Sequence, residues 1–178
     1  MDAGLTLNAT DFALFGLPER FALDAAQLDA KWKALQGAAH PDRFATETAA
    51  AQRVAMQWAI RINEAYRRLK DPLARAAYLC ELRGVPVDAE RNTAMPGTFL
   101  MQQMQWREAL DEAQGLADVE GLDEQVGKDE AARLAELSLL LDERNDTAAA
   151  AAQVRALMFV GRFRADVARR LEALDPTR

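Results

Sequence analysis

Apolar residues recur every three or four positions along most of this chain, which is the spacing of amphipathic helices. In the first half, this pattern predicts a short helical turn after Thr10 and helices over residues 25–38, 46–69 and 73–82. Asp24 is placed to cap the second of these elements. Pro41 cannot continue that helix, because proline lacks an N–H and its ring clashes with the preceding turn. The first half therefore predicts a helical hairpin with a sharp bend near Pro41.

The second half predicts three longer helices after an irregular connector. Between residues 84 and 97 the periodicity stops, and proline, glycine, aspartate and asparagine mark turns. Helices are expected over residues 98–116, 123–144 and 147–174. Short loops between long amphipathic helices favour antiparallel packing. We therefore predict an all-α chain: a helical-hairpin domain over residues 1–83, a connector over 84–97 and a three-helix bundle over 98–178.

Composition narrows the possible functions. The chain has 178 residues, is half hydrophobic and carries a formal net charge of −6, so it repels phosphates and is not expected to bind nucleic acid. The single cysteine, Cys80, excludes an internal disulfide and a cysteine-rich metal site, and its apolar neighbours favour a buried position. Because no apolar stretch approaches about 18 residues and no targeting pattern is visible, we expect a soluble intracellular protein without a membrane span.

The tripeptide His40-Pro41-Asp42 stands at the predicted bend, and His40 is the only histidine in the chain. A catalytic base at His40 would need a nucleophile, and no serine or cysteine stands nearby. One histidine and one aspartate are too few ligands for a metal. We therefore predict no catalytic residue, no metal, no cofactor and no enzyme activity. Two interpretations remain from the tripeptide alone: a plain solvated turn, or a docking loop whose carboxylate pairs with an arginine of a partner.

The surroundings of the tripeptide resemble the J-domain family over roughly residues 10–83. Ile62-Asn-Glu-Ala-Tyr66 precedes Leu69-Lys-Asp-Pro72, and Arg75 and Tyr78 follow. The resemblance implies that this half stimulates ATP hydrolysis by a DnaK-type chaperone. It also implies the residues that contact the chaperone: His40, Pro41, Asp42 and Lys31, with Lys33 and Arg43 in support.

The helix expected from residue 98 has two apolar faces. One is a narrow stripe that suits the bundle core: Phe99, Trp106, Leu110 and Ala113. Leu100, Met101 and Met104 fall on the opposite side, with Gln105, Arg107 and Glu108 at its rim, and Phe159 of the last helix is placed to join them. This second face either packs against the first half of the chain or binds a partner, because exposed leucine and methionine with a polar rim mark recognition surfaces.

A J-domain followed by a compact helical bundle is similar to the HscB family of iron–sulfur co-chaperones, and residues 98–112 look like that family's client-binding helix. The resemblance implies a chain that binds the scaffold protein IscU and delivers it to the chaperone HscA, and we expect this chain to be a monomer. The matching scaffold contacts are Leu100, Met101, Met104, Arg107, Glu108 and Phe159. Gln105 and Trp106 depart from the family pattern, which more typically has an acidic and an aliphatic residue there. The absence of paired Cys-x-x-Cys units favours a bacterial, cytoplasmic member.

Two alternatives to this function stay open at the level of sequence. A general J-domain co-chaperone would hold unfolded clients of many kinds. A structural interaction module would use the tripeptide as a plain turn, and no chaperone would respond to it.

Overall fold

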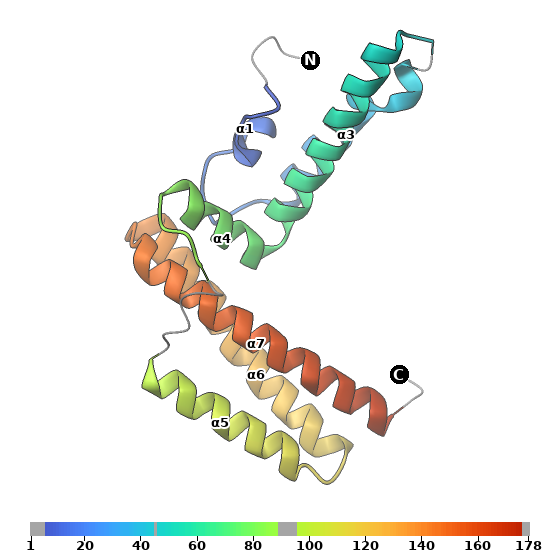
Figure 1. Cartoon of the computed structure of the whole chain (residues 1–178). Helices are drawn as coiled ribbons and strands as arrows, with labels where there is room; N and C mark the ends of the chain where they lie inside the picture. Colours follow the sequence, from blue (N-terminus) through green and yellow to red (C-terminus); the bar gives the residue numbers. More distant parts are fainter. Residues whose placement is uncertain (1–5, 45, 89–95, 176–178) are drawn as a thin grey trace. The chain divides into compact units, whose positions relative to one another are not determined.

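The computed structural model describes residues 6–44, 46–88 and 96–175, and every regular element in these ranges is helical (Figure 1). The predicted all-α class is thus confirmed. Two compact units divide the chain between Leu79 and Cys80, inside one helix. The predicted connector, residues 84–97, is described only in part, because residues 89–95 lie outside the described ranges.

The described residues of the first unit form four α-helices and one 3-10 turn. They are α1 (Asp11–Leu14), α2 (Ala25–Ala39), the turn η1 (Pro41–Phe44), α3 (Ala49–Lys70) and α4 (Pro72–Leu82), whose last three residues belong to the second unit. Thr10, Asp24 and Thr48 cap α1, α2 and α3 by accepting backbone N–H bonds through their side chains. The predicted helix over residues 46–69 thus begins later than expected, because Thr48 is its N-cap.

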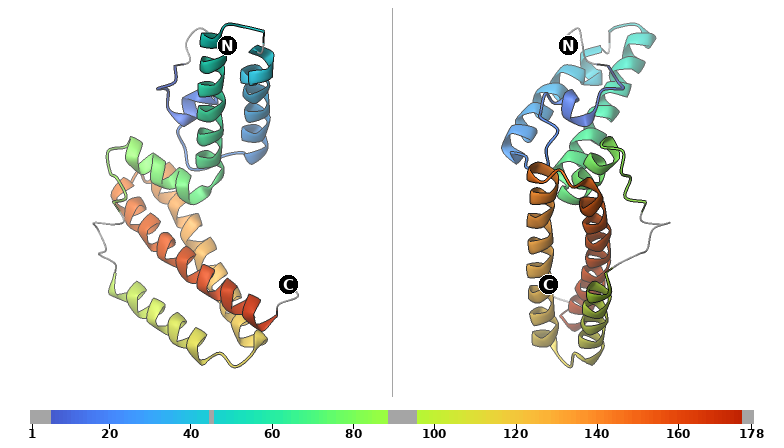
Figure 2. Two further views of the ribbon diagram at one scale, coloured as in Figure 1. Left: turned by 45° about the vertical axis from the view of Figure 1, so that its right-hand side comes forward. Right: turned by 90° about the vertical axis from the view of Figure 1, so that its left-hand side faces the viewer.

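Helices α2 and α3 pack side by side as the two arms of the hairpin (Figure 2). The rings of Trp32 and Tyr66 are stacked with centroids 4.6 Å apart. Asn63 Oδ1 accepts hydrogen bonds from Trp32 Nε1 at 3.0 Å and from Gln36 Nε2 at 2.6 Å, while the Tyr66 hydroxyl donates to Asp29 at 2.8 Å. These contacts join α2 to α3. Because the His40 loop connects these two helices, the contacts fix the position of the loop.

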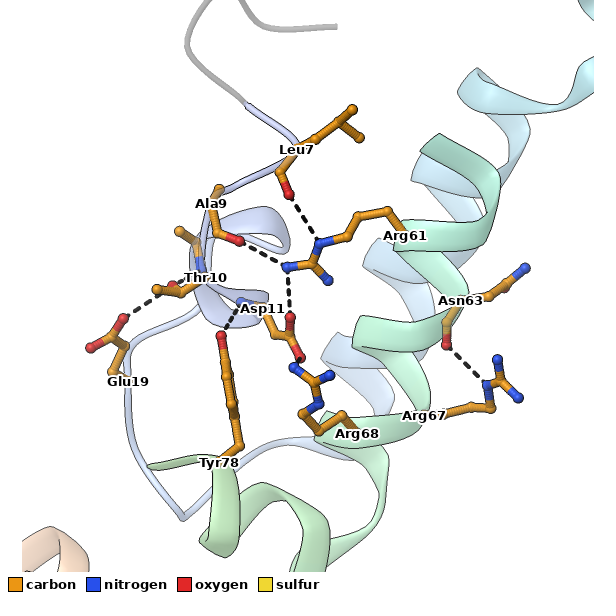
Figure 3. A network of polar contacts seen from close by, with 11 residues as sticks. Leu7, Ala9, Thr10, Asp11, Glu19, Arg61, Asn63, Arg67, Arg68 and Tyr78 are labelled. Carbon is orange, nitrogen blue, oxygen red and sulfur yellow. Dashed lines mark hydrogen bonds and ion pairs between the residues drawn. The ribbon is translucent and has the colours of Figure 1, made fainter. Parts of the chain in front are cut away.

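A buried carboxylate ties the N-terminal segment to α3 and α4 (Figure 3). The Asp11 side chain is fully buried and pairs with Arg61 at 2.7 Å and Arg68 at 3.1 Å. The Asp11 N–H donates to the Tyr78 hydroxyl at 3.0 Å, and Arg61 also donates to the carbonyl of Ala9 at 2.8 Å. Burial of an ionised carboxylate is tolerated when it is paired in this way.

In the second unit, the described residues form the end of α4 and three further helices. They are α5 (Gly97–Glu112), α6 (Leu116–Ser138), which continues through one wider π-helical turn (Leu139–Glu143), and α7 (Thr147–Leu174). The predicted bounds of α7 are confirmed. Residues 144–146 join the π-helical turn to α7, and α6 and α7 pack side by side (Figure 2).

The predicted boundary between the first two bundle helices is wrong. Helix α5 ends at Glu112 rather than near residue 116, and α6 begins at Leu116 rather than near residue 123. The physical reason is a cap that the periodicity does not reveal. Gly115 is extended, and the Asp118 carboxylate accepts hydrogen bonds from the backbone N–H of Gln114 at 3.0 Å and of Gly115 at 3.3 Å.

All three bundle helices contribute to one apolar cluster. Its buried members are Phe99, Trp106, Ala113, Val119, Leu122, Val126, Ala156, Val160, Phe163 and Val167. Leu110, Phe159, Leu171 and Leu174 are partly buried against it. Three residues of the predicted core stripe of α5 are buried in the cluster and the fourth, Leu110, packs against it, so the opposite face of that helix is left outside the core.

Candidate functional site

The His-Pro-Asp loop lies at the end of α2. His40 is the C-terminal cap of that helix, and Pro41 begins the 3-10 turn that leads toward α3. The backbone carbonyl of His40 accepts from the N–H of Arg43 at 3.0 Å, which closes the turn. The side chains of His40 and Asp42 are 55% and 88% exposed.

The imidazole and the carboxylate of the loop lie next to each other. His40 Nδ1 accepts a hydrogen bond from the Asp42 N–H at 3.3 Å and lies 3.5 Å from Asp42 Oδ2. With Nδ1 as acceptor, the neutral ring carries its proton on Nε2. The loop therefore offers a donor and an anionic acceptor side by side, a pair suited to directional contact with a partner.

Two of the three cations predicted near the loop make contacts within the chain. Arg43 Nη1 donates to the carbonyl of Gly37 at 3.1 Å, where a cation stabilises the C-terminal end of α2. Lys31 Nζ donates to the carbonyl of Gly16 at 3.3 Å and so links α2 to the segment after α1. Lys33 is exposed. Arg43 thus helps to hold the loop, in addition to any contact it makes with a partner.

An apolar strip covers the outer face of α5. The strip consists of Leu100, Met101 and Met104, residues that are 46%, 64% and 70% exposed. Phe99 and Trp106, on the opposite face of the same helix, are buried in the bundle core. Exposed leucine and methionine side chains that lie together on a rigid helix are a common form of protein-binding surface.

The structure brings Arg107 and Phe159 together beside the strip. Arg107 and Glu108 are exposed on α5, and Phe159 of α7 is partly buried against the core. Arg107 and Phe159 line one depression of about 90 Å³ at the seam of α5 and α7. Trp106 is not part of this surface, because it is buried and stacks on Phe163 at 5.8 Å. The difference from the family pattern at Trp106 therefore affects the bundle core rather than the candidate binding surface.

The described ranges also show what else the chain holds. They contain no group of three or more histidine, cysteine, aspartate or glutamate side chains placed to hold a metal. Cys80 is buried, and burial raises the pKa of its thiol. No helix in these ranges has the length and apolarity needed to cross a membrane.

Comparison with known proteins shows to which protein family the chain belongs. The model of the HSCB C-terminal oligomerisation domain matches residues 95–168. The co-chaperone protein HscB homolog of Burkholderia mallei is 51% identical over 174 residues, which cover 96% of this chain and 99% of the relative. The homolog of Paraburkholderia phymatum is 48% identical over 173 residues, covering 96% and 98% of the two chains.

The chain belongs to the HscB co-chaperone family. Chaperone HscB from Vibrio cholerae has the same fold, with a TM-score of 0.82 and 37% identity over 93% of this chain and 99% of that one. The human co-chaperone protein HscB shares the fold at a TM-score of 0.87 and 22% identity, over 93% of this chain and 83% of that chain. The resemblance drawn from the sequence is therefore confirmed at the level of the family.

Proposed function

We propose that this chain acts in iron–sulfur cluster assembly in the bacterial cytoplasm. It binds the scaffold protein IscU through its second unit and delivers it to the DnaK-type chaperone HscA through its first. Joint binding raises the effective concentration of the scaffold at the chaperone. The chain itself catalyses no reaction and needs no cofactor.

The scaffold site is formed by the apolar strip with Arg107, Glu108 and Phe159. The observation that carries this assignment is the exposure of three large apolar side chains on a helix whose other face is buried. An apolar surface of this kind is costly to leave in water and supplies affinity when a partner covers it.

The chaperone site is formed by the His-Pro-Asp loop, with Lys31, Lys33 and Arg43 beside it. Its support is the exposure of His40 and Asp42 at the bend of a hairpin that other residues hold in place. A small polar loop gives a directional contact rather than a large buried area. We therefore assign the loop to stimulation of the chaperone's ATPase activity.

The test is an ATPase assay with purified HscA, IscU and the full chain carrying His40→Gln. Glutamine does not reproduce the planar imidazole or the positions of its ring nitrogens, and a contact that involves a charged group contributes about 1.5–3 kcal/mol. Stimulation should fall by roughly 10- to 150-fold, while calorimetry shows unchanged affinity for IscU. The matched control is Glu47→Gln, an exposed change beyond the loop, which should leave both quantities unchanged.

Two outcomes would contradict the proposal. Normal stimulation by the His40→Gln variant would show that the loop is a plain turn. Absence of IscU binding by the wild-type chain, together with suppression of aggregation of unrelated unfolded proteins, would favour a general J-domain co-chaperone.

A further inference from the structure

We propose that the depression between α5 and α7, lined by Gln103, Arg107, Phe159, Arg162 and Phe163, receives an acidic side chain of the scaffold bound on the apolar strip. This inference rests on the proposed function and adds a chemical requirement to it. It brings in two residues, Gln103 and Arg162, to which the sequence assigned no role.

Unlike Arg133 and Arg164 of the same bundle, the two arginines of the depression form no ion pair with a described carboxylate. Arg133 pairs with Asp129 at 2.5 Å, and Arg164 pairs with Asp123 at 3.1 Å and with Glu130 at 2.6 Å. Among the described residues, no carboxylate forms an ion pair with Arg107 or Arg162. The guanidinium of Arg162 lies over the ring of Phe159, 5.6 Å from its centroid. Two cations are thus held beside one small depression in a chain of formal net charge −6.

Gln103 adds an unmet hydrogen-bond donor to the same place. Its amide nitrogen is buried and has no acceptor among the described residues. A buried donor without an acceptor is unfavourable, and Gln103 is one of the residues that line the depression. Two guanidinium groups and an amide N–H are all donors, and a carboxylate is an acceptor with two oxygens.

The size and walls of the depression suit a short acidic side chain. Its volume is about 90 Å³, which leaves room for a carboxylate with one or two methylene groups. The rings of Phe159 and Phe163 provide apolar walls for the methylene groups. The donors recognise the charged end. An acidic side chain therefore matches both the polar and the apolar parts of the lining.

The occupant belongs to the protein that covers the apolar strip, because the two surfaces are continuous on α5. Arg107 follows Met104 by three residues and Leu100 by seven, so the three side chains follow one another along the same side of the helix. A scaffold that buries Leu100 and Met104 brings its neighbouring side chains to the depression. The apolar strip then supplies affinity, and the depression fixes the orientation of the partner.

Calorimetry with purified IscU and full-length variants tests the inference. Arg162→Gln should weaken binding by about tenfold or more and reduce the dependence of the affinity on NaCl concentration, because one charged contact is lost. The matched control is Arg169→Gln on the same helix, which removes the same charge from an arginine already paired with Asp166. Its affinity should equal that of the wild type.

The variant Gln103→Glu tests the depression without any partner. The new carboxylate joins a lining that includes Arg107 and Arg162 and should pair with them from within the chain. We expect the melting temperature to rise by about 2–4 °C and the affinity for IscU to fall by about tenfold. The double variant Gln103→Glu, Arg162→Gln should lose most of the rise in melting temperature.

The outcomes separate this inference from the proposed function. Wild-type affinity in Arg162→Gln, or an equal loss in Arg162→Gln and Arg169→Gln, would overturn the acidic contact and leave the scaffold site intact. Failure of the wild-type chain to bind IscU would overturn the proposed function. In that case the melting temperatures still decide whether the depression accepts a carboxylate, and no rise in Gln103→Glu would overturn the inference.

Discussion

The His-Pro-Asp loop presents polar side chains on an irregular backbone, whereas the strip on α5 presents apolar side chains on a regular helix. The loop is polar and lies where a helix ends, at His40 and a 3-10 turn. The apolar strip lies on the outer face of an uninterrupted helix of 16 residues. Loop geometry depends on contacts made elsewhere, such as the bond from Arg43 to Gly37 and the bonds to Asn63. The relative positions of the side chains in the apolar strip follow from the regular geometry of α5.

This difference indicates which substitutions should disturb each surface. The loop can be disturbed by substitutions that loosen the hairpin, even when they lie far from His40. The strip should respond mainly to replacement of its own side chains, because the core on the other side of α5 holds the helix in place. Three experiments probe the contacts of these two regions, in order of decreasing expected effect.

The largest effect is expected from removing the apolar strip. Leu100→Ala combined with Met104→Ala should weaken IscU binding by about 2–4 kcal/mol, or roughly 30- to 1000-fold, if these side chains are anchors. ATPase stimulation in the absence of IscU should not change. Isothermal titration calorimetry measures the affinity, and circular dichroism checks the helix content.

The control for the strip is Met56→Ala on α3. Met56 is 51% exposed, so it undergoes the same chemical change at a similar exposure but on the first unit. Its affinity for IscU should equal that of the wild type. Unchanged affinity in the Leu100, Met104 variant would show that the strip does not contact the scaffold.

An intermediate effect is expected from Asp11→Ala in the first unit. The substitution leaves Arg61 and Arg68 without their carboxylate, and breaking a buried ion pair typically costs 3–5 kcal/mol. Arg61 and Arg68 are 20% and 45% exposed and regain some hydration. We therefore expect the free energy of unfolding, measured with urea, to fall by about 2–3 kcal/mol, with unchanged affinity for IscU.

Arg164→Gln provides the matched change in the second unit. Arg164 also pairs with two groups of opposite charge, but its side chain is 38% exposed. Exposed ion pairs contribute about 0.2–1 kcal/mol each, so the loss of two pairs should cost about 0.4–2 kcal/mol, less than the loss in Asp11→Ala. Equal losses in Asp11→Ala and Arg164→Gln would contradict the argument that burial determines the cost.

The smallest effect concerns the acid side of the stability curve. Hydrogen bonds from Lys70 and Tyr66 hold the pKa of Asp29 below its ordinary value of 3.8. An aspartate whose pKa is depressed on folding stabilises the fold fully above its unfolded pKa, and this contribution is lost as the pH falls through the folded pKa. The stabilisation is thus present at neutral pH and lost below about pH 3.8.

Lys70→Met should return the pKa of Asp29 toward 3.8, as followed by carboxyl ¹³C NMR during an acid titration. Lys33→Met is the control, because Lys33 acts on Asp29 only through a weaker charge interaction, and its removal should produce a smaller upward shift. A larger shift in Lys33→Met than in Lys70→Met would show that the hydrogen bond from Lys70 is not the main cause.

Much of the fold can be predicted from the sequence because its signals are local. Thr10 and Asp24 cap helices as expected, since a cap bonds to N–H groups two or three residues away. The core stripe of α5 is also confirmed, because helical periodicity places residues on faces without reference to the rest of the chain. The start of α6 was missed because Gly115 and Asp118 make a cap that lies outside the strong apolar pattern.

The two candidate surfaces could be anticipated to different degrees. Each residue assigned to the strip and its rim follows from the face of one helix or from the family resemblance. Arg107 and Phe159 line a common depression only because α5 and α7 pack at a particular register. The unmet amide of Gln103 and the unpaired state of Arg162 likewise depend on which side chains come near.

The sequence by itself thus determined the helical class, most helix ends and the polar and apolar faces of each helix, because these depend on residues within about one turn of each other. Only the tertiary structure decided that Asp11 pairs with Arg61 and Arg68, which lie 50 and 57 residues along the chain. It also decided that Arg43 closes the end of α2 and that two arginines share one depression. Such contacts are set by how helices pack, and a pattern within one helix carries no information about them.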